Sequence, residues 1–119
     1  MLDIDGLIVY PGSELPLLDA LELGSPGCIS ATANVNCTAI SQVIDLFDRG
    51  DKDAARALHA TVAEFRKVVQ EYAPIPAQKL LLAQSTGDSR WARVRPPLAS
   101  MSAEKGRALV AALAAIREF

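Results

Sequence analysis

Few side chains in this chain could do chemistry on the basis of their type and spacing. The sequence has one histidine, His59, and two cysteines, Cys28 and Cys37, which lack the CxxC spacing of redox and zinc motifs. A Cys/His metal site has too few ligands here, so we predict neither a metal nor another cofactor. We expect His59 to be an exposed or half-buried helix residue, because it has no evident serine or aspartate partner.

A second candidate is the basic, aromatic-bearing stretch that contains Arg90, Trp91, Arg93 and Arg95. Such a loop could contact nucleic acid, but the chain as a whole carries 12 basic against 14 acidic residues, a formal charge of −2. Nucleic-acid binding needs a stronger positive field than this. We therefore expect solvated arginines around a tucked Trp91, and we expect no nucleic-acid partner.

Length and composition suit a single globular domain. The chain has 119 residues, of which 50% are hydrophobic and 22% charged, so the composition is not that of a disordered protein. Its longest apolar runs are far shorter than the roughly 20 residues that cross a bilayer. The first five residues carry two acids and no basic residue, unlike a secretory signal. We expect a reducing, cytoplasmic setting without a membrane.

The first third of the sequence has the pattern of a strand, a helix and a second strand. Leu7–Tyr10 is a continuous apolar run between turn residues, which is typical of a buried parallel strand. Ser13 and Glu14 are expected to open a helix that ends at Gly24. Cys28–Ala33 is predicted to be the second strand, parallel to the first across a right-handed crossover.

The remainder is predicted to be helical. Apolar residues recur at helical spacing in three segments, and Ser102 is a cap for the last of them. The stretch Gly87–Pro97 is expected to be a loop. The predicted helices are Thr38–Arg49, Asp53–Ala73, a shorter one over Pro76–Ser85, and Ser102–Phe119.

Two strands form too small a sheet to be stable alone, so the pattern indicates part of a larger α/β layer.

Several motifs along the sequence resemble those of a known family. Pro11-Gly12-Ser13-Glu14 followed by Gly27-Cys28-Ile29-Ser30-Ala31-Thr32-Ala33-Asn34-Val35 is similar to the last two strands of the dihydrodipicolinate synthase/N-acetylneuraminate lyase family. Three later motifs are similar to the C-terminal helical region of that family: Gly50-Asp51, Pro74-Ile75-Pro76 and Arg95-Pro96-Pro97-Leu98.

The resemblance implies an α/β fold in which residues 1–50 form the last two βα units of a (β/α)₈ TIM barrel and residues 51–119 form a helical extension. Members of the family are class I aldolases and lyases, in which a lysine forms a Schiff base with pyruvate or another 2-oxo acid and a tyrosine relays protons. An iminium accepts the electrons released when a carbon–carbon bond is cleaved.

The resemblance also implies substrate-binding roles for Gly12, Ser13, Glu14 and Ile29. Gly12 would let the backbone approach the substrate, Ser13 or Glu14 would bind its distal end, and Ile29 would line the pocket. The alternative is purely structural: Gly12 as a turn glycine, Ser13 as a helix cap and Ile29 as a core residue. Ser13 stands where many members have aspartate.

The family's lysine and tyrosine have no counterpart in this chain, so we predict no catalytic residue here. A nucleophilic amine needs a desolvated pocket, and the four lysines (Lys52, Lys67, Lys79 and Lys105) fall in helical or helix-linking segments. We expect the isolated chain to be inactive, and to be a homo-oligomer or to be complemented by an N-terminal part that holds the 2-oxo-acid site. The alternative function is a non-catalytic helical module for interaction or oligomerisation; a standalone small-molecule binder ranks last, for lack of enclosing walls.

Overall fold

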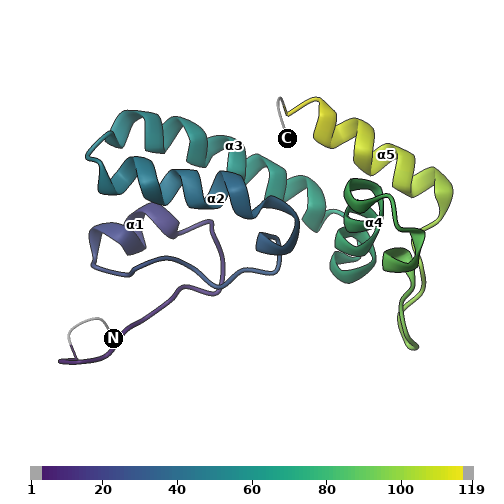
Figure 1. The fold of residues 1–119 in the computed structure, drawn as a ribbon, viewed down its shortest axis with the longest axis horizontal. Helices are drawn as coiled ribbons and strands as arrows, with labels where there is room; N and C mark the ends of the chain where they lie inside the picture. The colour runs from purple at the N-terminus through teal and green to yellow at the C-terminus, as the bar shows by residue number, and fades with distance from the viewer. Residues whose placement is uncertain (1–3, 117–119) are drawn as a thin grey trace. The chain divides into compact units, whose positions relative to one another are not determined.

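The computed structural model describes residues 4–116 and shows helices joined by extended segments and turns (Figure 1). The chain divides into two compact units, unit 1 (Met1–Ala63) and unit 2 (Glu64–Phe119). The elements of the described residues are α1 (Leu17–Glu22), α2 (Ala33–Asp48), α3 (Lys52–Gln70), α4 (Pro74–Thr86), the 3₁₀ turn η1 (Ser89–Ala92) and α5 (Ala103–Ala114).

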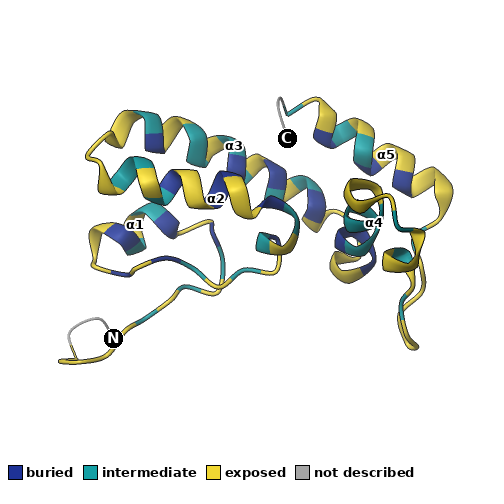
Figure 2. Cartoon of the chain, in the orientation of Figure 1, coloured by how far each residue is buried: buried dark blue, intermediate teal, exposed yellow. Residues whose placement is uncertain are grey.

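The core of unit 1 is apolar and receives side chains from three helices. On α2 the inward residues recur every three or four positions, so one face of the helix turns to the core (Figure 2). Full burial of each larger aliphatic side chain contributes about 1.5–3 kcal/mol. The core consists of Leu17 and Leu21 from α1, Ala39, Ile40 and Val43 from α2, and Val62 from α3.

Helix α2 is kinked near its start. The kink lies at Asn36, whose φ of −142° and ψ of 30° are not helical. Asn36 is buried, and its Nδ2 has no hydrogen-bond partner among the described residues. Asparagine often favours such breaks because its side chain competes with the helical main chain. The residues before Asn36 therefore form a separate turn that follows directly on Ser30 and Thr32.

Unit 2 is held by contacts of α4 with η1 and with α5. Leu109 and Leu113 of α5 are buried. The two helices approach closely at Gly106, where an added Cβ would lie 2.8 Å from a terminal methyl carbon of Leu80. Helix α4 starts with a proline, whose missing N–H costs nothing in the first turn, and it ends at Gly87 with a φ of +69°.

The predicted α/β fold is wrong for the structure as described. No β-strand occurs among residues 4–116, so the two barrel units expected over residues 1–50 are not formed. The two segments predicted as strands are Leu7–Tyr10 and Cys28–Ala33. Among the described residues, one main-chain hydrogen bond links the second segment to the end of the first, from Ile29 N to Pro11 O at 3.0 Å. A strand needs a ladder of such bonds, and Pro11 and Pro26 have no N–H to give.

Two further boundaries differ from the prediction. The first helix begins at Leu17 rather than at Ser13, because Glu14 turns into the interior instead of occupying the first turn. Ala33, the last residue of the second predicted strand, is instead the first residue of α2. The helices expected over Thr38–Arg49 and Asp53–Ala73 are confirmed as parts of α2 and α3, apart from their ends.

The helical prediction for the last third is also confirmed. The short helix expected over Pro76–Ser85 is α4, and the cap at Ser102 is present, with the Ser102 hydroxyl accepting a hydrogen bond from Lys105 N at 3.3 Å. The expected loop Gly87–Pro97 contains the 3₁₀ turn η1. The last three residues of the helix predicted to end at Phe119 lie outside the described residues.

Neither a membrane span nor a disulfide is found in the part of the chain that the structure covers. None of the helices within residues 4–116 combines the length and the apolar character that a bilayer crossing requires. Cys28 is half-buried and Cys37 is exposed, and neither belongs to a disulfide.

Candidate functional site

The candidate site lies in unit 1, on the turn before α1 and the extended segment before α2. The turn is shaped locally: Ser13 Oγ accepts a hydrogen bond from Leu15 N at 3.1 Å, and Leu17 N donates to Glu14 O at 3.1 Å. These bonds place Ser13 at the surface side of the turn and direct the Glu14 side chain inward. Ser13 therefore caps a turn, and α1 itself has no side-chain cap.

The centre of the site is the carboxylate of Glu14, which is fully buried. It accepts hydrogen bonds from the hydroxyls of Ser30 and Thr32, and these two hydroxyls lie 3.0 Å apart. A buried carboxylate without partners would be strongly destabilising, whereas hydroxyl donors to a charged oxygen form strong hydrogen bonds. Glu14, Ser30 and Thr32, which we call the Glu14 cluster, thus fix the turn against the segment before α2.

His59 holds the same turn from α3. Its Nε2 lies 2.8 Å from the main-chain oxygen of Glu14. Because a carbonyl oxygen can only accept, Nε2 must carry the proton in this contact. His59 is half-buried, as predicted, but its contact with Glu14 was not foreseen. The two residues are 45 positions apart in the sequence, and no local motif signals such a pair.

The remaining predicted substrate residues lie on the surface of the same two segments. Gly12 is exposed and an added Cβ there would meet no atom within 4 Å, so packing does not require glycine at this position. The Ile29 side chain is 71% exposed, which does not fit a core residue. The Ile29–Pro11 hydrogen bond brings Ile29 beside the Gly12 turn. The structure therefore gathers Gly12, Ser13, Glu14 and Ile29 in one region, with only Glu14 buried.

No metal site is apparent in the described part of the chain, where no group of three or more histidine, cysteine or acidic side chains could hold an ion. The hydroxyls and the carboxylate of the Glu14 cluster are already engaged with one another. The Glu14 cluster can therefore orient a polar ligand beside the half-buried Ser30, and the cluster itself consists of a carboxylate and two hydroxyls.

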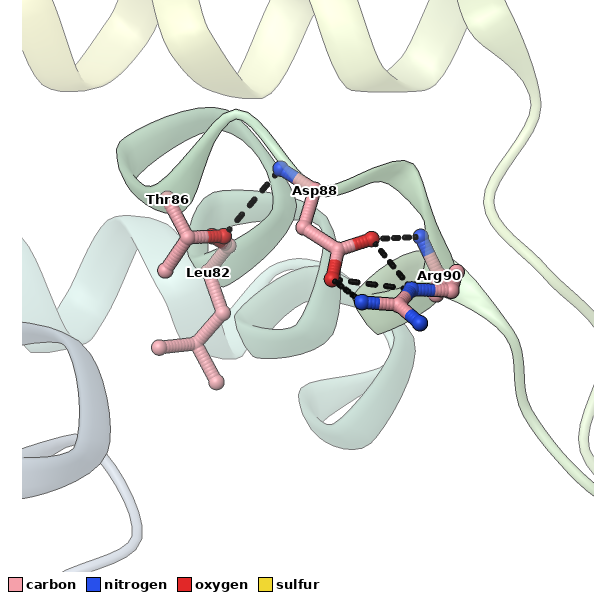
Figure 3. A network of polar contacts seen from close by, with 4 residues as sticks. All are labelled: Leu82, Thr86, Asp88 and Arg90. Atoms are coloured by element: carbon pink, nitrogen blue, oxygen red, sulfur yellow. Dashed lines mark hydrogen bonds and ion pairs between the residues drawn. The ribbon is translucent and has the colours of Figure 1, made fainter.

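The basic stretch in unit 2 forms a local network at the end of α4 (Figure 3). The Asp88 carboxylate accepts bidentate hydrogen bonds from the guanidinium of Arg90, the shortest at 2.7 Å, and also accepts one from Arg90 N. Thr86 Oγ1 donates to Leu82 O at 2.7 Å and accepts from Asp88 N at 3.3 Å. The hydrogen bond from Arg90 lowers the pKa of Asp88 below its ordinary value and raises the pKa of Arg90.

Trp91 is not tucked under the arginines as expected, since 45% of it is exposed. The Lys79 ammonium lies 5.9 Å from the centre of its ring, within the range of a cation–π contact. A shallow hollow of about 310 Å³ is lined by Lys79, Arg93 and Arg95 together with apolar residues. None of the residues predicted to bind substrate lies there.

Comparisons with known proteins find the same family that the sequence motifs resemble. The sequence pattern of the Dihydrodipicolinate synthetase family matches residues 3–116. The 4-hydroxy-tetrahydrodipicolinate synthase of Synechococcus sp. (strain CC9605) is 34% identical over 113 residues, which is 94% of this chain and 36% of that enzyme. The chain thus spans about a third of the length of the curated relatives it matches.

Solved structures give the same picture. The crystal structure of dihydrodipicolinate synthase from Agrobacterium tumefaciens is 27% identical and aligns with a TM-score of 0.72, covering 94% of this chain and 36% of that one. The N-acetylneuraminate lyase (sialic acid aldolase) from Aliivibrio salmonicida is 28% identical, with a TM-score of 0.75 over 89% of this chain and 35% of that one. In both cases nearly all of this chain is matched by a minority of a longer protein.

Proposed function

The chain belongs to the dihydrodipicolinate synthetase family, and on that premise we propose that it is the C-terminal part of a class I aldolase or lyase that acts on pyruvate or another 2-oxo acid. The single observation that carries the proposal is the match over nearly the whole chain, which includes the Gly12 turn and the Ile29–Thr32 segment. The likeness to enzymes described as synthase and lyase supports carbon–carbon bond chemistry.

In this proposal the chain supplies part of the substrate site and not the reacting amine. Gly12, Ser13 and Ile29 contact the substrate, since they are at least partly exposed. Glu14 is buried, so it acts by holding the hydroxyl of the half-buried Ser30 in a fixed orientation. Pre-oriented hydroxyl groups bind a substrate at lower entropic cost than mobile ones.

The surroundings of the lysines support the prediction that the isolated chain forms no Schiff base. Schiff-base formation requires an unprotonated amine that adds to the keto carbon with loss of water, and a desolvated pocket favours that form. Lys52, Lys67 and Lys105 are exposed on helices. Lys79 is half-buried, but it lies over the exposed ring of Trp91 and not in a closed pocket. The Schiff-base lysine is therefore proposed to come from the portion that the relatives have in addition.

A chimera tests the proposed function. The part of the Agrobacterium tumefaciens enzyme that matches this chain is replaced by this chain, and the chimera is reduced with borohydride in the presence of pyruvate. We expect a stable adduct by mass spectrometry. Ser30→Ala is expected to lower the rate of adduct formation about tenfold, and the matched control Ser41→Ala, an exposed serine of α2, to leave it unchanged.

Two results would contradict the proposal. A chimera that folds, judged by circular dichroism and light scattering, but traps no pyruvate would exclude the substrate-site role. A borohydride-stable adduct on any of the four lysines of the isolated chain would exclude the prediction of inactivity.

The alternative is a non-catalytic helical module for interaction or oligomerisation in a cytoplasmic setting. The packed core of unit 1 favours it, because three helices already bury one another there. Light scattering and thermal melting of the isolated chain distinguish the two. A clean monomer with one cooperative melting transition argues against a missing portion, whereas loose packing without a cooperative transition favours one.

A further inference from the structure

Unit 2 contains a shallow basic hollow that the proposed function does not use. The hollow has a volume of about 310 Å³. Its three basic residues are Lys79 from α4 and Arg93 and Arg95 from the segment after η1, and its other residues are apolar. We call it the Lys79 hollow, and it is lined by Ile75, Lys79, Arg93, Val94, Arg95 and Leu98.

The three basic residues of the Lys79 hollow have no acidic partner in the part of the chain that the structure describes. Within residues 4–116, no carboxylate forms an ion pair with Lys79, Arg93 or Arg95. Asp88 interacts with the charge of Arg93 through space, but its carboxylate is already bound by Arg90. Like charges that line one hollow repel one another, so an anion that enters the hollow is attracted by all three.

Lys79 is held at the hollow by an aromatic neighbour. Its ammonium lies 5.9 Å from the centre of the Trp91 ring, and Lys79 is half-buried, whereas Arg93 and Arg95 are exposed. The cation–π contact restricts a flexible side chain before any ligand binds, which reduces the entropic cost of binding. Trp91 is also the single tryptophan of the chain, so its fluorescence reports on events at Lys79.

Apolar side chains border the three charges. Ile75 and Leu98 line the hollow, and they are 53% and 40% exposed. A ligand that covers them removes apolar surface from water, which favours binding. The Lys79 hollow therefore suits a ligand that has an anionic head and an apolar body.

We propose that the Lys79 hollow binds a small phosphate monoester whose ester group is apolar or aromatic. A phosphate monoester carries a charge of about −1.5 to −2 at pH 7 and three acceptor oxygens, whereas a carboxylate has a single charge and two oxygens. Arginine binds phosphate through two parallel hydrogen bonds, and lysine binds it as a point charge. Two arginines and a lysine on one hollow therefore match a phosphate better than a carboxylate.

The size of the hollow favours a small molecule over a macromolecule. Small-molecule sites in proteins start at roughly 300 Å³, and the Lys79 hollow is close to that lower limit. The inference does not rest on the proposed function, because none of the residues predicted to bind substrate lines the hollow.

Titration of the full chain with phenyl phosphate tests the proposal. Binding is followed by Trp91 fluorescence and by isothermal titration calorimetry. We expect saturable binding of one molecule per chain that weakens as salt is added, because two of the three basic residues are exposed. Benzoate has the same ring and a single charge, so we expect it to bind about tenfold more weakly.

Variants separate the contribution of the charges from that of the apolar border. Arg93→Gln and Arg95→Gln are each expected to weaken phenyl phosphate binding about tenfold, since each removes hydrogen bonds to a charged group. Arg107→Gln is the matched control, because it removes the same charge from an exposed arginine of α5 that does not line the hollow, and it should leave the affinity unchanged. Ile75→Ser should weaken the binding of phenyl phosphate but not that of inorganic phosphate. Circular dichroism checks that each variant is folded.

Four results would overturn the proposal. The first is a folded chain that shows no saturable binding of phenyl phosphate, and the second is benzoate binding as tight as that of phenyl phosphate. The third is a loss in Arg107→Gln as large as that in Arg95→Gln, which would indicate a general charge effect. The fourth concerns vesicles of phosphatidylcholine and phosphatidic acid, which present the same head group. A chain that sediments with these vesicles but does not bind phenyl phosphate would assign the hollow to a lipid surface.

Discussion

Polar side chains join distant parts of the sequence in unit 1, whereas at the helix ends of unit 2 they bind close neighbours. In unit 1, Glu14 binds hydroxyls 16 and 18 residues away, and His59 reaches the main chain 45 residues away. In unit 2, the Asp88–Arg90 and Ser102–Lys105 contacts span two and three residues. Unit 1 therefore depends on tertiary packing, and the helix ends of unit 2 are specified locally.

The two units also differ in charge. Residues 1–63 contain nine acidic and three basic residues, and residues 64–119 contain five acidic and nine basic ones, so the net charges are −6 and +4. Most of these charges are exposed, so dissolved salt screens the interactions between them. Glu14 is the exception in unit 1, because its burial shields it from solvent ions. The comparison predicts that variants of the buried polar contacts have large effects and variants of exposed contacts small ones.

The largest effect is expected for Glu14→Ala. The change removes the buried acceptor of the Ser30 and Thr32 hydroxyls, and the loss of a hydrogen bond to a charged group costs about 1.5–3 kcal/mol. We expect the free energy of unfolding of unit 1 to fall by about 3 kcal/mol. Amide hydrogen exchange in α1 and α2 measures it, because a loss of that size speeds exchange about a hundredfold.

The control for this variant is Glu22→Ala. Glu22 pairs with Lys52 at 3.5 Å, but both side chains are 51% exposed, so its loss should change stability by less than about 0.5 kcal/mol. Equal effects of the two variants would show that the Glu14 cluster gives unit 1 no special stability.

The next effect concerns Ser25, which ties the two extended segments together. Ser25→Ala removes a buried hydroxyl from the main-chain oxygens of Val9 and Gly27. We expect a loss of about 1–2 kcal/mol, because buried carbonyl groups lose their partner. Urea unfolding followed by circular dichroism measures it, and Ser41→Ala on the exposed face of α2 serves as the control. No loss of stability in Ser25→Ala, or an equal loss in Ser41→Ala, would contradict the role of Ser25 in joining the two segments.

These contacts also explain which parts of the fold were predictable. The helices α3, α4 and α5 follow from apolar spacing, the proline at the start of α4 and the cap at Ser102, all of which are local signals. The segments Leu7–Tyr10 and Cys28–Ala33 have the composition of buried strands, but whether such a run pairs depends on neighbours outside the segment. Among the described residues the two segments share one main-chain hydrogen bond and have no further partner strand. The prediction of strands from composition was therefore wrong.

The candidate site was predictable only in part. The Gly12 turn and the Ile29 segment were identified from a family pattern, and the structure brings them together. The inward direction of Glu14 was missed because acidic residues are normally read as first-turn helix residues, and its hydroxyl partners follow 16 and 18 positions later. The contact of His59 could not be inferred at all, since it depends on where α3 packs.

A smaller effect is expected at the start of α5 in unit 2. Ser102→Ala removes the side-chain acceptor for Lys105 N, and loss of such a cap costs about 1 kcal/mol. Trp91 fluorescence during urea unfolding reports on unit 2 and measures the change. Ser85→Ala is the control, because the Ser85 hydroxyl adds only a second bond to a helix carbonyl at Leu82. An effect at Ser85 as large as that at Ser102 would argue against capping as the cause.

The smallest effect on stability is expected for Arg90→Ala, although its effect on titration should be clear. Arg90 is the main cause of the lowered pKa of Asp88, through a side-chain hydrogen bond, and Arg93 contributes a weaker Coulombic effect. Because the folded pKa of Asp88 lies below the unfolded value of about 3.9, the stability from this pair is complete above that value and is lost as the pH falls through the lower folded pKa.

The pair is fully exposed, so NMR titration of the Asp88 carboxyl is a better measurement than unfolding. Arg90→Ala should raise the pKa of Asp88 part of the way to its ordinary value, because the main-chain N–H of residue 90 still donates to the carboxylate, and Arg93→Ala should move the pKa less. If Arg93→Ala raised the pKa as much as Arg90→Ala, the local hydrogen bond would not be the cause, and the helix ends of unit 2 would depend on longer-range charge interactions.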